Sequence, residues 1–273
     1  MNRKKLIFLL PGLLLVNFSF SQVNFLGKPG YISTPSASWQ EERQLGITFS
    51  HLPGDYSVFK PAREENKVNL YSVRAGFTSF MEVNLSIAYR PLLAERIGVG
   101  DRQLDFRFRL FKETENRPAI VLGWTPPGSV SPVLAHDYLV ATKNLETQIG
   151  KFNFSLGWGS PYLFFIDKEK DGFFNSLQVV KKSELSEKKP RFNQNDYLDG
   201  FFGGFSYMPV DFGGLTFEYD TATFNAGVFI KAWEWLYLQA YTFEGKAWAY
   251  TFSTQFKLDF SPKALRQYEK NLD

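Results

Sequence analysis

Residues 103–110 read QLDFRFRL, and this stretch decides the fold. Polar or charged side chains alternate in it with large apolar ones. Because successive residues of a strand point to opposite faces, such a strand has one apolar and one polar face. The same alternation recurs in residues 82–89 (EVNLSIAY), 152–158 (FNFSLGW) and 248–256 (WAYTFSTQF). The sequence therefore predicts an all-β protein.

The connections between the predicted strands distinguish a membrane barrel from a soluble sandwich. About twelve strands are expected, near residues 45–51, 68–77, 81–90, 102–111, 118–125, 136–143, 151–158, 202–208, 213–220, 224–231, 234–242 and 247–257. The first eight connections are alternately longer and shorter, whereas the ninth and eleventh are short where length is allowed. Barrels with both termini in the periplasm have short turns there and longer loops outside. The pattern predicts a transmembrane antiparallel β-barrel.

The composition fits this class and excludes several functions. Aromatic residues make up 18% of the 273 residues, which suits a protein that needs rings on a lipid-facing surface. The net charge of +3, from 31 basic and 28 acidic residues, is too balanced to predict a nucleic-acid partner. Cysteine is absent, which removes disulfides, thiolate metal sites and the lipid-attachment cysteine of lipoproteins. We predict no cofactor and no metal.

The chain divides into four parts. Residues 1–21 combine a basic start, a short apolar run and small residues at the cleavage position, which predicts a cleaved signal peptide. Residues 22–44 form a segment rich in Gly and Pro. Residues 45–260 form the predicted barrel, which includes a charged loop at about 160–201 that we expect to be a solvated, partly disordered excursion. Residues 261–273 are a polar C-terminal tail.

The N-terminal segment is unlike the strands that follow it. Gly30 supplies conformational freedom, whereas Pro29 and Pro35 fix φ and remove hydrogen-bond donors. Together with Gly27, these residues predict a shaped turn or a short plug and not a central strand.

Charged side chains on the polar strand faces are expected to point into the lumen. They are Arg74, Glu82, Asp105, Arg107, Arg109 and Glu218. Unpaired charges in a narrow lumen are costly, so we expect a mixed-charge network that fills the bore or lines a pore. Structural pairing is the favoured interpretation, with ligand selectivity as the alternative. A glycosidase carboxylate pair is a weaker one, because the separation of the carboxylates is not readable from the sequence.

Histidine and tryptophan give only weak signals. His51 and His136 lie at predicted strand ends, outside any metal-binding or triad motif, which predicts interfacial roles. Most tryptophans also lie near strand ends, where a membrane-interface girdle is favoured over sugar stacking. The six tryptophans considered for these two roles are Trp39, Trp124, Trp158, Trp233, Trp235 and Trp248. We predict no catalytic residue.

Residues 27–37 (GKPGYISTPSA) resemble the opening motif of YjbH-type outer-membrane proteins, a family associated with exopolysaccharide or capsule production. Similar stretches follow in the family's order at residues 101–110, 118–123, 137–143, 157–159, 203–205 and 217–220. Typical members are longer, and residues 124–128 (WTPPG) replace their Asp-rich segment. The resemblance implies an outer-membrane barrel that helps to make or export polysaccharide, and it implies no catalytic residues.

Three functional hypotheses follow. The first is a non-enzymatic accessory barrel of exopolysaccharide biosynthesis or export, in contact with outer-membrane lipid, polysaccharide and periplasmic secretion partners. The second is a structural or scaffold barrel of a Bacteroidota protein secretion apparatus. The third is an outer-membrane hydrolase.

Overall fold

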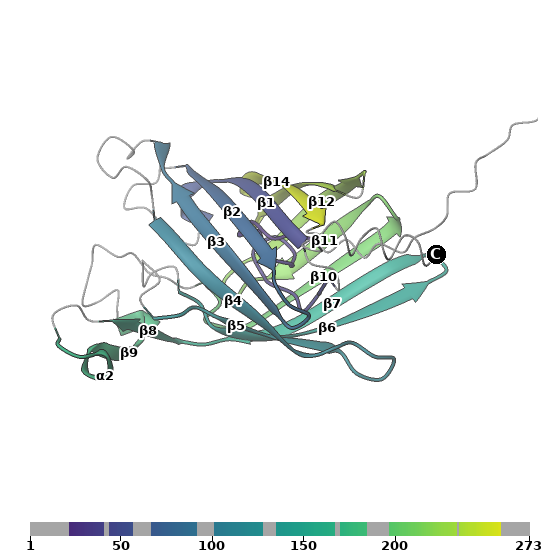
Figure 1. The fold of residues 1–273 in the computed structure, drawn as a ribbon. Coiled ribbons are helices and arrows are strands. Elements are labelled where there is room, and N and C mark those ends of the chain that lie inside the picture. Colours follow the sequence, from purple (N-terminus) through teal and green to yellow (C-terminus); the bar gives the residue numbers. More distant parts are fainter. Residues whose placement is uncertain are drawn as a thin grey trace, which may run out of the picture.

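The computed structural model describes residues 22–40, 44–56, 67–91, 101–127, 135–166, 170–184, 197–233 and 235–257. The predicted signal peptide and the polar tail lie outside these residues. Twelve of the described strands close into one antiparallel barrel (Figure 1). They are β1 (Gln44–Leu52), β2 (Val68–Gly76), β3 (Met81–Tyr89), β4 (Asp101–Phe111), β5 (Ala119–Trp124), β6 (Tyr138–Thr147), β7 (Gly150–Gly159), β10 (Gly200–Val210), β11 (Gly213–Tyr219), β12 (Phe224–Ala232), β13 (Leu236–Phe243) and β14 (Ala247–Lys257). The predicted fold class is confirmed.

The two ends of the barrel differ in their connections. Gln44 at the start of β1 pairs with Lys257 at the end of β14, so both strand termini lie at one end of the barrel. The turns at residues 77–80, 148–149 and 211–212 lie at this end, which we call the short-turn end. The connections between β1 and β2, β3 and β4, and β7 and β10 lie at the opposite, long-loop end.

No strand was predicted between residues 158 and 202, and this expectation is wrong. The loop at about 160–201 contains regular structure, because β8 (Tyr162–Ile166) pairs with β9 (Leu177–Lys181) in a separate two-stranded sheet. A short helix, α2 (Phe173–Ser176), lies between them. In Figure 1 this hairpin projects beyond the barrel wall at the long-loop end. A short 3-10 helix, η1 (Gly54–Tyr56), follows β1 at the same end.

The wall is apolar outside and polar inside. Large apolar side chains are exposed on the outer face, among them Ile47, Tyr71, Val73, Leu85, Leu122, Leu139, Phe154, Leu156, Phe217, Val228, Leu238 and Phe252. Polar side chains alternate with them and are buried, among them Thr48, Ser72, Asn84, Gln103, Thr142, Ser155, Ser206, Thr216, Asn225, Gln239, Thr251 and Ser253. A water-soluble barrel would have the reverse arrangement. The outer face therefore matches lipid, as in a membrane-embedded barrel whose closed sheet satisfies its own backbone. No helix among the described residues is long and apolar enough to span a membrane.

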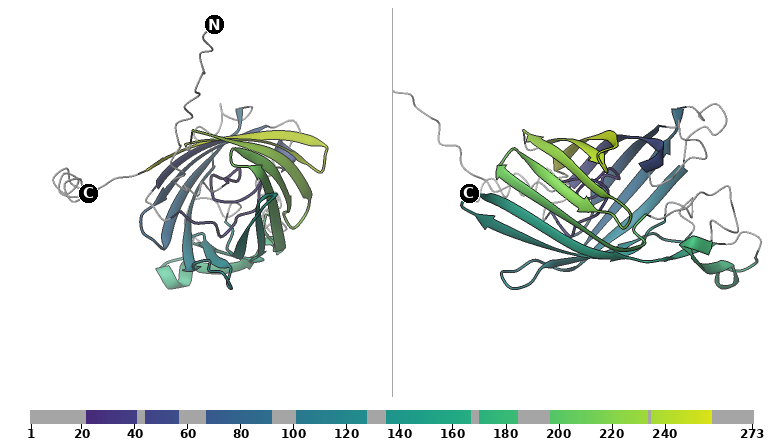
Figure 2. Two further views of the ribbon diagram at one scale, coloured as in Figure 1. Left: turned by 90° about the vertical axis from the view of Figure 1, so that its right-hand side faces the viewer. Right: turned by 180° about the vertical axis from the view of Figure 1, so that it is seen from behind.

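Residues 22–40 lie inside the barrel, where Figure 2 shows the N-terminal segment within the ring of strands. Residues 22–37 are all buried. Two isolated bridges, Val23 with Pro29 and Gly30 with Pro35, fold the segment back on itself. At Gly27 φ is +80°, and a Cβ there would lie 2.6 Å from the Ser72 Cβ, so glycine is needed at this turn. We call residues 22–40 the plug.

Candidate functional site

The two ends of the plug, Gln22 and Gln40, both lie near the short-turn end. Its middle part reaches the long-loop end, where Phe25, Leu26 and Ile32 pack against wall residues that include Leu52 and Phe243. Beyond this apex the plug returns, and Gln40 donates a hydrogen bond to Gln255 on β14. The apex of the plug thus packs against apolar wall residues at the long-loop end of the bore.

Glu218 on β11 binds the turn of the plug through both carboxylate oxygens. The backbone N–H groups of Ile32, Ser33 and Thr34 donate to it at 2.9–3.0 Å. The hydroxyls of Ser33 and Thr34 donate at 2.5 and 2.8 Å, and the Asn225 amide donates at 3.0 Å. A carboxylate that accepts several N–H and O–H donors is well stabilised without a cation. Glu218 therefore fixes the plug to the β11–β12 side of the wall.

Lys28 is the cation of the plug and pairs with the opposite part of the wall. Its Nζ lies 2.6 Å from an Asp105 carboxylate oxygen, and both side chains are buried. It also contacts the His136 ring, whose Nε2 is 3.8 Å from Asp105. Gln103 and Thr125 donate to the same carboxylate at 2.5 and 3.0 Å. A buried ion pair needs such surrounding hydrogen bonds to offset its desolvation. The cluster around Asp105 therefore stabilises the charged Lys28 of the plug.

Glu82 on β3 forms the centre of a second buried charge cluster. It accepts from Arg74 at 3.0 Å on one oxygen and from Arg107 on the other. Arg107 also donates to the backbone carbonyl of Ser36 in the plug at 2.8 Å. Its guanidinium lies 5.4 Å from the centre of the Trp39 ring. The returning part of the plug is thus held by a wall arginine whose charge Glu82 compensates.

Tyr31 fixes the plug to a fourth part of the wall. Its hydroxyl contacts Ser155 at 2.7 Å and donates to Asn153, both on β7. Its ring lies against Gly204 on β10, where a Cβ would come within 2.1 Å of the ring. Glycine at this position therefore makes the space that the ring occupies.

Five of the six charged candidates are buried in the lumen and make the contacts described above. They are Arg74, Glu82, Asp105, Arg107 and Glu218. Arg109 differs, since it is only partly buried, lies near the short-turn end and has its guanidinium 5.1 Å from the Trp39 ring. Of the N-terminal motif, Gly27 forms the turn beside Ser72. Pro29, Gly30 and Pro35 form the two bridges inside the plug.

Two interfacial assignments are wrong. His136 is buried in the lumen, 2% exposed, beside Lys28. Trp39 belongs to the plug and stacks with two lumen arginines. His51 is partly buried, bonds to Asn69 and stacks on Tyr250. The other tryptophans are exposed near strand ends, where a girdle would place them; they are Trp124, Trp158, Trp233, Trp235 and Trp248.

Sequence reasoning missed Lys28 and Tyr31 as contact residues of the plug. A signal for the first was present, because Lys28 is the sole charged residue in residues 22–37. A lone charge in a segment that enters a lumen needs a partner of opposite sign on the wall.

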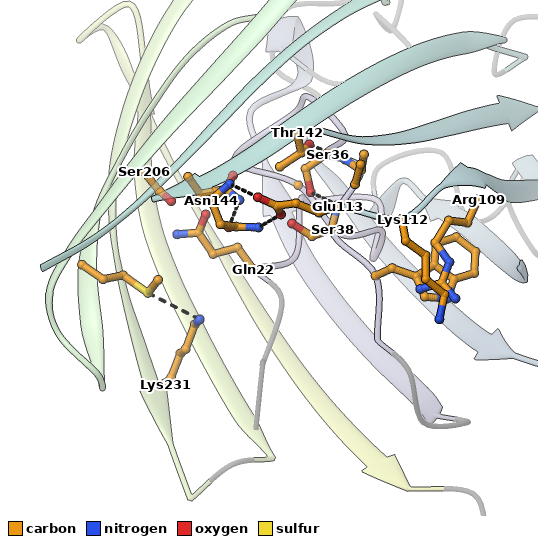
Figure 3. Close-up of a pocket in the computed structure, with 16 residues that line it drawn as sticks. Gln22, Ser36, Ser38, Arg109, Lys112, Glu113, Thr142, Asn144, Ser206 and Lys231 are labelled. Atoms are coloured by element: carbon orange, nitrogen blue, oxygen red, sulfur yellow. Dashed lines mark hydrogen bonds between the residues drawn. The ribbon is translucent and has the colours of Figure 1, made fainter. Parts of the chain in front are cut away.

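A polar cavity of about 280 Å³ remains between the plug and the wall near the short-turn end (Figure 3). The plug contributes Gln22 and residues 36–39, and the wall contributes residues of β4, β6, β7, β10 and β12. No group of three or more His, Cys, Asp or Glu side chains in the part of the chain that the structure describes is arranged to hold a metal ion.

These features define a class: a closed, membrane-type β-barrel whose lumen is filled by its own N-terminal segment. The family model for the exopolysaccharide biosynthesis protein YbjH matches residues 22–271, so the chain belongs to this family. The match covers the plug and the whole barrel. No curated protein is matched by the sequence.

Proposed function

We propose that this protein is an outer-membrane accessory of exopolysaccharide or capsule biosynthesis or export that catalyses no reaction. Three features support it: the family, whose description names exopolysaccharide biosynthesis, the apolar outer face, and a signal-peptide pattern ahead of the barrel. Short turns and strand termini of such barrels lie on the periplasmic side. The cavity then opens toward the periplasm, and the β8–β9 hairpin lies outside the cell.

The proposed mode of action rests on the position of the plug inside the barrel. Its contacts with Glu218, Asp105 and Arg107 come from several sides of the wall and occupy the bore. A polysaccharide chain needs a continuous passage, and in the described part of the chain residues 22–40 occupy the bore. We therefore propose that the protein binds glycan or docks periplasmic secretion partners at its ends, and does not conduct polymer in this state.

Deleting the gene and measuring the amount and composition of surface polysaccharide tests the cellular role. We expect a loss or a change in composition that the wild-type gene restores. Unchanged polysaccharide in both respects would contradict the proposal. Fractionation, with heat-modifiable migration on a gel, tests the location, since a folded barrel in the outer membrane migrates differently before and after boiling.

The non-enzymatic assignment has its own test. Glu82, Asp105 and Glu218 are each engaged by cations or several donors that hold the wall and plug together. Purified protein is therefore expected to leave exopolysaccharide chain length unchanged on incubation. Shortening that disappears in Glu82→Gln, Asp105→Asn or Glu218→Gln would contradict this assignment.

A further inference from the structure

The cavity near the short-turn end is cationic on two opposite walls. Arg109 and Lys112 come from β4 and the residue that follows it, whereas Lys231 comes from β12. In the closed order of strands, β4 and β12 are separated by five strands in either direction, so they face each other across the bore. Figure 3 shows Lys231 on one side of the cavity and Arg109 with Lys112 on the other.

The carboxylate that lines the cavity is already engaged within the protein. Glu113 accepts from the Asn144 backbone and side chain at 2.8 and 2.5 Å, and Lys143 lies 3.3 Å away. The lining thus has three cationic side chains against one carboxylate with local partners. A site of this kind favours an anionic ligand and opposes a cationic one.

The remaining lining is suited to hydroxyl groups. Ser36 and Ser38 of the plug and Asn153 of β7 supply donors and acceptors. Ser206 is 1% exposed, and its Oγ has no hydrogen-bond partner among the described residues. Buried hydroxyls are normally paired, so an orphan Oγ at a cavity wall indicates a ligand atom or water as its partner.

Trp39 adds a flat apolar surface to this polar lining. Arginines 107 and 109 hold the ring at 5.4 and 5.1 Å. These cation-π contacts fix the ring in place and keep the Arg109 guanidinium beside the cavity. Cations and hydroxyl partners are together the chemistry that recognises an acidic sugar.

We propose that this cavity binds the end of an acidic polysaccharide, with carboxylate-bearing sugar rings between Lys231 and the Arg109–Lys112 wall. The choice of a saccharide rests on the proposed function, whereas the choice of an acidic one rests on the cavity. Its volume of about 280 Å³ lies just below the ~300–1,000 Å³ typical of ligand sites. The site therefore takes a chain end or a short branch, and the plug stops it from going further.

Calorimetric titration of the full, detergent-solubilised protein tests the site with a short oligouronate, a neutral oligosaccharide of the same length and inorganic phosphate. The oligouronate is expected to bind, and the neutral chain at least about ten-fold more weakly, since a charge-assisted contact contributes about that factor. Lys231→Gln and Arg109→Gln should each weaken oligouronate binding about ten-fold. Lys246→Gln, in the β13–β14 turn at the other end, should leave it unchanged. Heat-modifiable migration confirms that each variant is folded.

Equal affinity for the acidic and neutral chains, or full affinity in folded Lys231→Gln, would overturn the proposal. Phosphate that binds as tightly as the oligouronate and competes with it would reduce the cavity to a simple anion site. The two proposals fail separately. A deletion that alters surface polysaccharide, with no oligouronate binding in vitro, removes the site and keeps the accessory role. Oligouronate binding in vitro, with a deletion that leaves surface polysaccharide unaltered, keeps the site and removes the accessory role.

Discussion

The two ends of the bore are lined by different chemistry. At the long-loop end the plug packs Phe25, Leu26 and Ile32 against apolar wall residues. At the short-turn end the same segment is surrounded by cations, hydroxyls and amides, and a cavity remains. Between the two ends, Asp105 and Glu218 bind the plug by charge. The plug therefore makes mainly apolar contacts toward the longer loops, whereas it leaves a polar, cationic cavity toward the short turns.

The largest expected effect is that of removing the charge opposite Lys28. Asp105→Asn leaves the Lys28 ammonium buried beside His136 without its carboxylate. Breaking a buried pair in this way costs about 3–5 kcal/mol. Urea unfolding in detergent micelles should show the loss. The double variant Lys28→Met with Asp105→Leu should recover most of it, because an apolar pair of similar volume replaces the ion pair. An Asp105→Asn protein of wild-type stability would show that this pair does not fix the plug.

Loss of the carboxylate on the other side of the wall should release the plug locally. Glu218→Ala leaves three backbone N–H donors of residues 32–34 without their acceptor, at a cost of about 2–4 kcal/mol. Hydrogen exchange at these amides should become at least about 100-fold faster, while exchange in β1 stays slow. Glu218→Gln keeps one acceptor oxygen and should have a smaller effect. Equal protection in wild type and Glu218→Ala would separate Glu218 from plug seating.

A small change at the apex tests the apolar end. Ile32→Val removes one buried methylene from the cluster at the long-loop end and should destabilise the fold by about 0.5–1.5 kcal/mol. Oligouronate binding at the other end should not change. A loss of binding in this variant would mean that the two ends do not act independently.

The smallest effect is expected at the exposed pair of the β13–β14 turn. Lys246 lies 3.1 Å from Glu244, and this hydrogen bond lowers the pKa of the Glu244 carboxyl. Exposed pairs are screened by solvent, so Lys246→Gln should leave stability and ligand binding unchanged within error. A clear loss of stability or of ligand binding would show that charge at the long-loop end contributes to that property, which the apolar packing described above does not predict.

The strands were predictable because polar and apolar residues alternate within each one, and this alternation identifies its two faces. Residues 103–110 and 152–158 alternate cleanly, and β4 and β7 contain them. The β8–β9 hairpin was missed because residues 162–166 (YLFFI) are apolar without alternation. Strand ends were less well predicted, as for β6, where hydrogen bonding to β7 continues through the polar residues up to Thr147.

The site was predictable by residue type but not by partner. A charged residue on a polar strand face is expected to point into a lumen, as Glu218 does. Its donors in the plug lie 184–186 residues away in the sequence, and neither face periodicity nor composition specifies such a pairing. The cavity depends on how the returning plug lies against β6 and β10, so only the assembled barrel reveals it.

The central claim is that residues 22–40 fill the bore, and conductance across a planar lipid bilayer tests it most directly. Wild-type protein should be silent or nearly so, whereas a folded variant lacking residues 22–40 should conduct ions steadily through the vacated lumen. A wild-type protein that conducts as well as the deletion variant would contradict the account.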